Sequence, residues 1–201
     1  MRYRFGLKEL FFVLIGTGLT ALLGNVNVGF TVNSCRVVQP EAIVTAIFAM
    51  LSGPIVGGLV GFLGYIMSKL LSGQVYFLGW AIANMIVGIG IGIYAEGYGL
   101  REGCFKGDKV ALFNMIQLIA NGGAFLLLYP LAEMFMHGTL IRTALQTGIA
   151  LFIINSLIIG FAASLLGLLY SAMVHVKKKD VKKQKDSTDL LKEQRRVPME
   201  K

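Results

Sequence analysis

Aromatic rings and amide side chains interrupt a largely apolar sequence, and together they offer the chemistry of ligand binding. Ring faces stack on planar molecules, and a few placed polar groups fix the orientation of a small ligand. Ionisable groups inside a membrane domain face its interior or water, because exposing them to lipid is costly. The candidate ligand-binding residues are Asn33, Arg36, Gln39, Tyr65, Tyr76, Trp80, Asn84, Tyr129, Glu133, His137, Arg142 and Gln146.

Some of these residues also have a purely structural explanation. Tyr76 and Trp80 are typical of the aromatic belt at a membrane interface. His137, next to Gly138, is equally consistent with an ordinary loop position. Gln39 is harder to explain in this way, because an amide near a helix start in lipid needs a hydrogen-bond partner, and the same holds for Asn84.

Glu133 lies four residues from both Tyr129 and His137, so the three residues share one helical face. An ion pair between Glu133 and Arg142 fits the sequence as well as a ligand contact does. Glu41 near a helix start also suits the positive end of the helix dipole. The sequence leaves both interpretations of these carboxylates open.

A second polar stripe consists of Asn114, Gln117 and Asn121, which recur at helical spacing on the inner half of one apolar segment. Amides inside a membrane bundle usually form hydrogen bonds between helices. We therefore favour interhelical bonding for this stripe, with an ion path as the alternative.

Motifs of catalysis and of metal binding are missing from the sequence. It contains no GxxxxGK[ST], HExxH or GxSxG pattern. Neither Cys35 nor Cys104 has the neighbours of a metal site, and Glu41 and Glu133 are not clustered. We expect a protein that is not an enzyme and has no cofactor, no metal and no disulfide.

Long apolar runs predict the elements that hold these residues. The sequence is 55% hydrophobic and only 15% charged, whereas soluble domains average about 25% charged residues. We predict an all-α integral membrane bundle of six transmembrane helices, formed by residues 1–175. The expected spans are approximately 10–23, 40–52, 55–72, 77–95, 110–136 and 141–174.

Basic residues are concentrated on one predicted side of the membrane. Residues 177–201 hold ten basic and five acidic residues, and further basic residues lie at the N-terminus and between the fourth and fifth spans. The positive-inside rule therefore predicts that both termini are cytoplasmic. We expect residues 176–201 to form a basic cytoplasmic tail, either a helical extension or disordered, which does not bind nucleic acid because aromatics are absent there.

Small residues form stripes on the first three predicted helices. Pro54 follows Gly53 and predicts a tight turn between two helices. Small residues let another helix approach closely in lipid, so they suit either a docking surface for a partner or packing within the chain. The candidate docking residues are Gly16, Ala42, Ala46, Ala49, Gly57, Gly61 and Gly64.

The sequence resembles the substrate-binding S components of energy-coupling factor (ECF) transporters, in particular the riboflavin-type or uncharacterised group. The resemblance covers residues 1–175. It rests on the size, the six spans and one hairpin pattern, formed by Arg36, Gln39, Pro40, Ala42, Ala46, Gly53, Pro54, Gly57, Gly61 and Gly64.

This resemblance implies a mechanism and a set of partners. An S component of the bacterial plasma membrane captures a vitamin from outside and associates with a transmembrane coupling subunit and two cytoplasmic ATPases. The small-residue faces would contact the coupling subunit, and the S component topples in the bilayer to release its substrate. Riboflavin is the first candidate, followed by cobalamin, pyridoxine-type or thiamine-type compounds and queuosine-like bases. The alternatives are a stand-alone secondary carrier or channel, and a structural subunit without a ligand.

Overall fold

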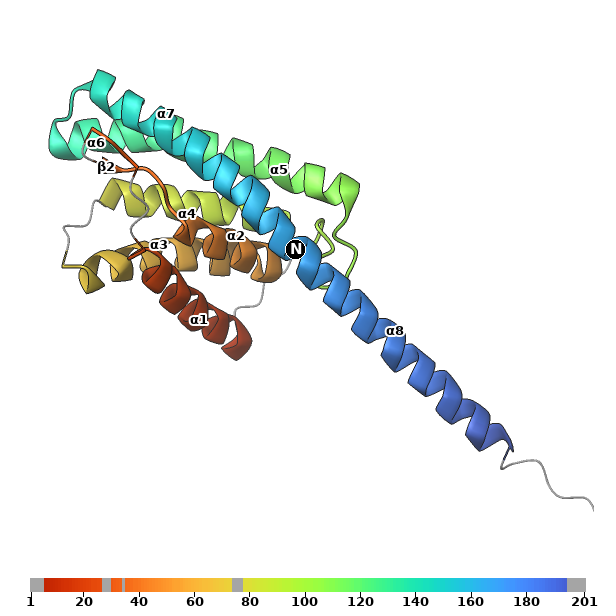
Figure 1. Cartoon of the computed structure of the whole chain (residues 1–201). Helices are drawn as coiled ribbons and strands as arrows, with labels where there is room; N and C mark the ends of the chain where they lie inside the picture. Colours follow the sequence, from red (N-terminus) through yellow and green to blue (C-terminus); the bar gives the residue numbers. More distant parts are fainter. Residues whose placement is uncertain (1–5, 27–29, 34, 74–77, 195–201) are drawn as a thin grey trace, which may run out of the picture.

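The computed structural model describes residues 6–26, 30–33, 35–73 and 78–194, and these residues form a helical bundle (Figure 1). The first four helices run back and forth through the bundle. They are α1 (Leu7–Leu23), α2 (Glu41–Ser52), α3 (Pro54–Leu71) and α4 (Leu78–Ile93). Gly53 separates α2 from α3 with φ 89°, a left-handed conformation that suits glycine, and Pro54 starts α3.

Two longer helical segments complete the bundle. The first joins α5 (Gly107–Gly122), the π-helical η1 (Gly123–Leu128) and α6 (Tyr129–His137). The second joins α7 (Ile141–Ile158), the π-helical η2 (Ile159–Ala163) and α8 (Ser164–Gln194). The described part of the chain is therefore all-α with six helical segments, as predicted, apart from one short hairpin.

Length and hydropathy identify three of the described helical segments as long and apolar enough to cross a membrane. These are Pro54–Leu71, Gly107–His137 and Ile141–Lys179, and the shorter apolar helices are Glu41–Ser52 and Leu78–Ile93. A helix needs about 20 apolar residues to cross a hydrocarbon core of about 30 Å, so α2, with 12 residues, is too short to cross alone.

An extended segment lies before α2 and accounts for its shortness. The strands β1 (Thr31–Val32) and β2 (Cys35–Arg36) pair antiparallel, with Asn33 between them at φ 49°. Asn33 Nδ2 donates to Thr147 Oγ1 at 3.1 Å, and six residues later Gln39 bonds Asn155. On a helix, the eight residues from Thr147 to Asn155 rise about 12 Å. The extended segment thus runs alongside α7, from Thr147 to Asn155, before α2 begins.

Close contacts between glycines and backbone hold α3 against α4. A Cβ atom on Gly88 would meet the carbonyl group of Gly57, and one on Gly92 would meet Pro54. Such contacts are typical of helices that pack in lipid, where the absence of a side chain lets backbones approach.

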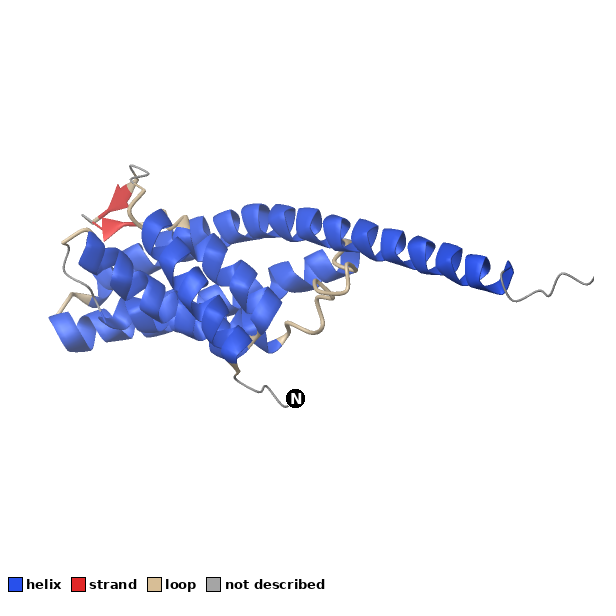
Figure 2. Ribbon diagram, turned by 90° about the horizontal axis from the view of Figure 1, so that it is seen from below, coloured by secondary structure: helices blue, strands red, loops and turns tan. Residues whose placement is uncertain are grey.

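The end of the bundle opposite the hairpin is covered by the loop of residues 94–106 (Figure 2). Phe105 donates from its backbone N–H to Ser171 Oγ at 3.0 Å, and Lys178 Nζ donates to the carbonyl oxygen of Glu102 at 3.1 Å. Tyr98 is buried and donates to the carbonyl oxygen of Ile91. Burial raises the pKa of the Tyr98 hydroxyl, and Tyr94 adds to the rise. Helix α8 continues past this loop, away from the bundle (Figure 1).

Candidate ligand-binding site

Three of the predicted aromatic residues meet in one cluster between α3, α4 and α6. The rings of Tyr65 and Trp80 stack with centroids 6.0 Å apart and planes at 18°, and Tyr129 meets Trp80 edge-on at 5.4 Å. All three side chains are 3–6% exposed. The indole Nε1 of Trp80 has no hydrogen-bond partner among the described residues. The cluster therefore combines buried, mutually packed rings with one donor that no described residue uses.

Asn84 and Glu41 lie near this aromatic cluster. A Cβ on Gly61 would meet both the backbone of Asn84 and the methyl group of Thr45, so these residues lie at one depth. Glu41 precedes Thr45 by four residues on α2, and Trp80 precedes Asn84 by four residues on α4. Glu41 and Trp80 therefore both lie about one helical turn closer to the hairpin end. Both Asn84 and Glu41 are buried, and Asn84 Nδ2 donates to the carbonyl oxygen of Trp80 at 3.1 Å.

The amide side chains of Gln39, in the extended segment, and Asn155, on α7, form a buried hydrogen bond. Asn155 Nδ2 donates to Gln39 Oε1 at 2.9 Å, and the two residues are 0% and 2% exposed. The other amide atom, Asn155 Oδ1, is buried with no partner among the described residues. Sequence reasoning included Gln39 but missed Asn155. The available signal was one asparagine within an apolar run of α7.

Two residues of the second polar stripe, Asn114 and Gln117, bond across to another helix, as favoured from the sequence, whereas Asn121 bonds within its own helix. Gln117 Nε2 donates to the carbonyl oxygen of Ser156 at 3.1 Å, and Asn121 Nδ2 donates to Gln117 Oε1 at 3.0 Å and to its carbonyl oxygen at 2.8 Å. Asn114 Nδ2 donates to Ser164 Oγ at 3.0 Å. These bonds to backbone carbonyls fix which amide atom of Gln117 and Asn121 is the donor.

The two sets of amide contacts meet neighbouring residues of α7. Gln39 bonds Asn155, and Gln117 bonds Ser156, which follows Asn155. Asn121 Oδ1 and Ser156 Oγ, like Asn155 Oδ1, are buried without a partner in the described part of the chain. A buried polar atom left without a partner costs about 1–3 kcal/mol. We define Asn155, Ser156 and Asn121 as the amide cluster. It suits a ligand that supplies N–H or O–H groups.

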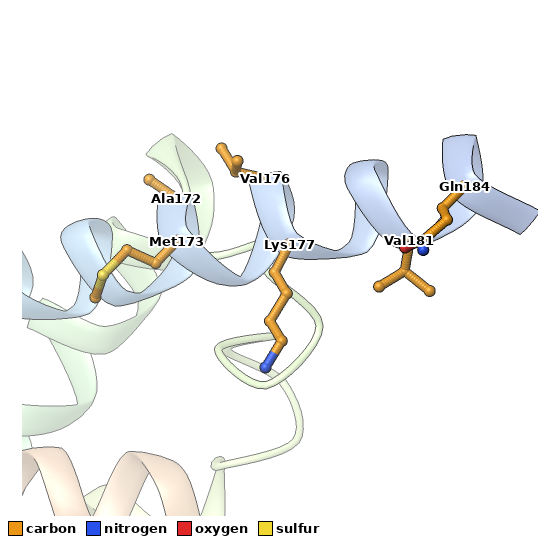
Figure 3. Close-up of a pocket in the computed structure, with 6 residues that line it drawn as sticks. All are labelled: Ala172, Met173, Val176, Lys177, Val181 and Gln184. Atoms are coloured by element: carbon orange, nitrogen blue, oxygen red, sulfur yellow. The ribbon is translucent and has the colours of Figure 1, made fainter.

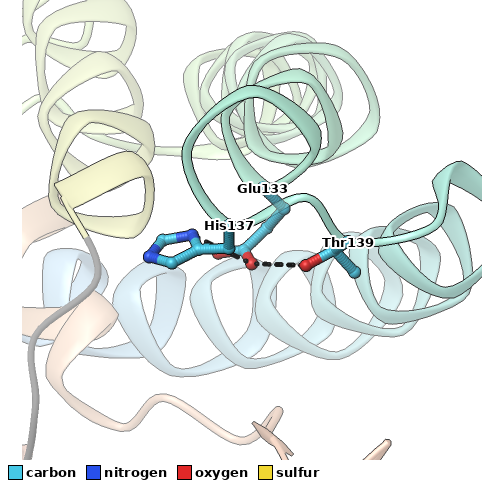
Figure 4. Close-up of polar contacts among 3 residues, drawn as sticks. All are labelled: Glu133, His137 and Thr139. Carbon is cyan, nitrogen blue, oxygen red and sulfur yellow. Dashed lines mark hydrogen bonds and ion pairs between the residues drawn. The ribbon is translucent and has the colours of Figure 1, made fainter.

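Glu133 contacts groups at the end of its own helix (Figure 4). Its Oε2 atom lies 3.5 Å from His137 Nδ1 and 3.5 Å from Thr139 Oγ1. Gly138 follows with φ 64° and ends the helix, donating its N–H to the carbonyl oxygen of Met134. The contacts of Glu133 seen here are thus with His137 and Thr139, where the sequence also allowed Arg142.

Other candidates lie apart from the aromatic cluster. Arg142 and Gln146 are exposed on α7, whereas Thr147 and Asn155 on the same helix are buried. Asn33 is in the hairpin, where it bonds α7. The side chain of Arg36 and the whole of Tyr76 lie outside the described residues.

The seven candidate docking residues all have neighbours within the chain. Ala42, Ala46 and Ala49 are buried. A Cβ on Gly16 would meet Val60, and Cβ atoms on the other three glycines would meet residues of neighbouring helices; these glycines are Gly57, Gly61 and Gly64. Packing within the chain accounts for these contacts, and docking of a partner through the same residues stays a prediction.

A hollow on α8 lies outside this site (Figure 3). It is lined by residues of that helix alone, namely Ala172, Met173, Val176, Lys177, Val181 and Gln184. The aromatic and amide clusters contribute nothing to it, so the hollow is a separate feature of the surface.

Comparison with known proteins decides the family. Residues 4–172 match the model of the ECF-type riboflavin transporter, S component. The chain belongs to this family. The family consists of transporter S components and is not a family of enzymes. The resemblance predicted from the sequence is therefore confirmed.

The S component is also similar to UPF0397 proteins of Streptococcus pneumoniae. Those of strains CGSP14 and P1031 are each 29% identical to it over 171 residues, which cover 85% of this chain and 93% of theirs. The UPF0397 protein of serotype 4 strain TIGR4 has the same identity and coverage. No solved structure matches the chain.

Proposed function

We propose that this S component captures a planar, uncharged or mildly anionic vitamin-like molecule from outside the bacterial plasma membrane. A partner module then drives uptake by ATP hydrolysis. The observation that carries the proposal is the buried stack of Tyr65 on Trp80, within a bundle that also buries polar atoms for which no described residue is a partner. Ring faces with a few convergent polar groups are typical of small-molecule sites.

The polar atoms favour a ligand with several hydrogen-bond donors. Asn155 Oδ1 and Asn121 Oδ1 are acceptors, and both residues are fully buried. In our proposal the planar part of the ligand stacks in the aromatic cluster, while its N–H or O–H groups bind the amide cluster. Riboflavin, named in the description of the family, has a ring system with an N–H group and a hydroxylated chain, and is the first candidate. Cobalamin, pyridoxine-type and thiamine-type compounds and queuosine-like bases are the other molecules to test.

The proposed topology has six crossings with both termini in the cytoplasm. The loop of residues 94–106 and helix α8 lie at one end, and the hairpin lies at the other (Figure 2). The basic residues Arg101, Lys106 and Lys109 are at the first end, where the six lysines of residues 177–185 also follow the bundle. The positive-inside rule assigns this end to the cytoplasm. The extended segment before α2 completes the second crossing, since non-helical backbone at membrane depth is tolerated inside protein.

The proposed partners are a transmembrane coupling subunit and two cytoplasmic ATPases. Membership of the ECF transporter S-component family supports them. In this proposal the chain itself binds and delivers, and the partners supply the free energy.

The direct test is ligand binding by the purified full-length protein in detergent. Trp80 is the only tryptophan, so its fluorescence reports on the aromatic cluster during titration with the vitamin panel, and calorimetry gives the affinity. We expect one compound to bind with a dissociation constant below about 1 μM and to quench the fluorescence of Trp80. Folded protein that binds no vitamin or precursor at micromolar concentration would contradict the proposal.

Reconstitution separates this function from that of a stand-alone carrier. We expect liposomes that contain the chain alone to bind the ligand without accumulating it or passing it down a gradient. Transport by the chain alone would establish the carrier alternative.

A further inference from the structure

The hollow on α8 faces away from the bundle. Ser171 and Lys178 mark the inward face, because both bond the loop of residues 94–106. Successive helical residues are about 100° apart, so Met173 and Lys177 lie about 200° and 240° around the helix from Ser171. Met173 is 66% exposed and Val176 58% exposed. In a membrane protein this outward face meets lipid or another membrane-bound molecule.

The hollow begins at the depth where the apolar part of α8 ends. A Cβ on Gly167 would meet the ring of Phe105, and one on Gly103 would meet the backbone of His175, so residues 167–175 lie beside the inner loop. The sequence is largely apolar up to Val176, with Ser171 and His175 as the polar exceptions in its last turns, and lysines follow at once. Met173 and Val176 thus lie next to acyl chains, while Lys177 lies at the level of lipid headgroups in the proposed orientation.

Charge at this level favours an anionic occupant. Residues 177–185 contain six lysines and one aspartate, Asp180. A polybasic segment directly after a membrane span attracts anionic lipids of the cytoplasmic leaflet. A second copy of the chain fits this face less well. Two copies in one membrane have the same orientation, so pairing their α8 helices would place the lysines of one copy next to those of the other, and like charges repel.

We propose that this face of α8 binds an anionic phospholipid of the cytoplasmic leaflet. One acyl chain packs along Met173 and Val176, and the phosphate group contacts the ammonium group of Lys177. Val181 and Gln184 border the headgroup on the side away from the bilayer (Figure 3). The apolar floor, the lysine at its end and the depth in the bilayer together match a phospholipid. The proposal uses the orientation stated above but does not depend on substrate binding.

The test uses full-length protein in nanodiscs made from equal amounts of phosphatidylglycerol and phosphatidylcholine. After release into the gas phase, native mass spectrometry counts the lipids of each kind that stay bound. We expect wild-type protein to retain phosphatidylglycerol preferentially. Lys177→Gln should reduce that preference about fivefold, the effect of one basic residue near an anionic surface, and Lys177→Arg should keep it.

Lys106→Gln is the matched control. Lys106 is an exposed lysine of the loop of residues 94–106, outside the hollow. Its replacement therefore removes the same charge from the same side of the protein. We expect it to leave the preference almost unchanged. Equal losses for Lys106→Gln and Lys177→Gln would mean diffuse attraction only and would overturn the proposal. Retention of the two lipids in bilayer proportion by the wild type would overturn it as well. Ligand binding can be measured on the same samples, so failure here is distinguishable from failure of the proposed function.

Discussion

Asn155 donates a hydrogen bond from Nδ2 to Oε1 of Gln39 across 2.9 Å, and both residues are buried. This contact joins the last turn of α7 to the residue that precedes Pro40 and α2. It also orients the Oδ1 atom of Asn155, which has no partner within the described ranges of the chain. The same hydrogen bond therefore holds the extended segment in the bundle and positions a group of the proposed site.

Replacing Gln39 by leucine should destabilise the protein, because the amide of Asn155 loses its partner in a buried place. We expect a loss of about 1–3 kcal/mol in the free energy of unfolding, measured by denaturant titration in detergent. The double variant Gln39→Leu/Asn155→Leu should lose less than the sum of the two single variants, since it leaves no orphaned amide. Ligand affinity should fall in both single variants.

Gln146→Leu is the control for this double-mutant cycle, because Gln146 is an exposed amide on the same helix. Its effect should stay within about 0.5 kcal/mol, as for most surface substitutions. Additive effects of the Gln39 and Asn155 substitutions would show that the two amides do not stabilise one another.

Trp80→Phe should separate ring stacking from hydrogen bonding. Phenylalanine keeps a ring against Tyr65 and Tyr129 but removes the indole N–H, which has no partner among the described residues. We expect ligand affinity, measured by calorimetry, to fall about tenfold, the equivalent of a hydrogen bond worth about 1.4 kcal/mol. Stability without ligand should change little, whereas Trp80→Ala should lose about 3–5 kcal/mol. Unchanged affinity in Trp80→Phe would mean that the N–H does not contact the ligand.

The helices and their main turn could be predicted from the sequence, because both depend on local patterns. Apolar length sets the segments, and Gly53 followed by Pro54 ends one helix and begins the next. The aromatic cluster was partly predictable for the same reason. Tyr65, Trp80 and Tyr129 lie near the predicted outer helix ends, and antiparallel helices bring such ends together.

The depth of the site was not predictable, since it depends on where the extended segment lies. Polar residues near the predicted outer helix ends point to the site, but Asn155 lies three residues before the opposite end of α7, so its position gives no such signal. Arg142 and Gln146 do lie near such an outer end, yet they lie on the exposed face of α7. The faces of a largely apolar helix carry little amphipathic signal, and only the packed structure separates them.

Tyr98 predicts a dependence of stability on alkaline pH. Burial raises its pKa above the ordinary value, and Tyr94 adds to the rise. The unfolded chain therefore releases this proton near pH 10, while the folded chain keeps it. The unfolded state then binds fewer protons, so the free energy of unfolding should fall as the pH rises above about 10.

Tyr98→Phe checks this prediction. At pH 8 the variant should be about 1 kcal/mol less stable than the wild type, because it loses the hydrogen bond to the carbonyl oxygen of Ile91. Between pH 10 and 11 the wild type should lose stability faster than the variant, so the difference between them narrows. Denaturant titrations at both pH values measure it. A constant difference would show that Tyr98 does not contribute to the alkaline decline.

Two glycines on different helices predict opposite responses to the same small substitution. A Cβ atom on Gly88 would meet the carbonyl group and backbone of Gly57, whereas a Cβ on Gly18 would meet nothing within 4 Å. Gly88→Ala must push α4 away from α3, and overpacking of this kind costs about 1–3 kcal/mol. Gly18→Ala instead removes a glycine from a helix interior and should stabilise α1 by up to about 1 kcal/mol. Thermal unfolding of the two variants in detergent should shift in opposite directions, and equal shifts would contradict the close approach of α3 and α4.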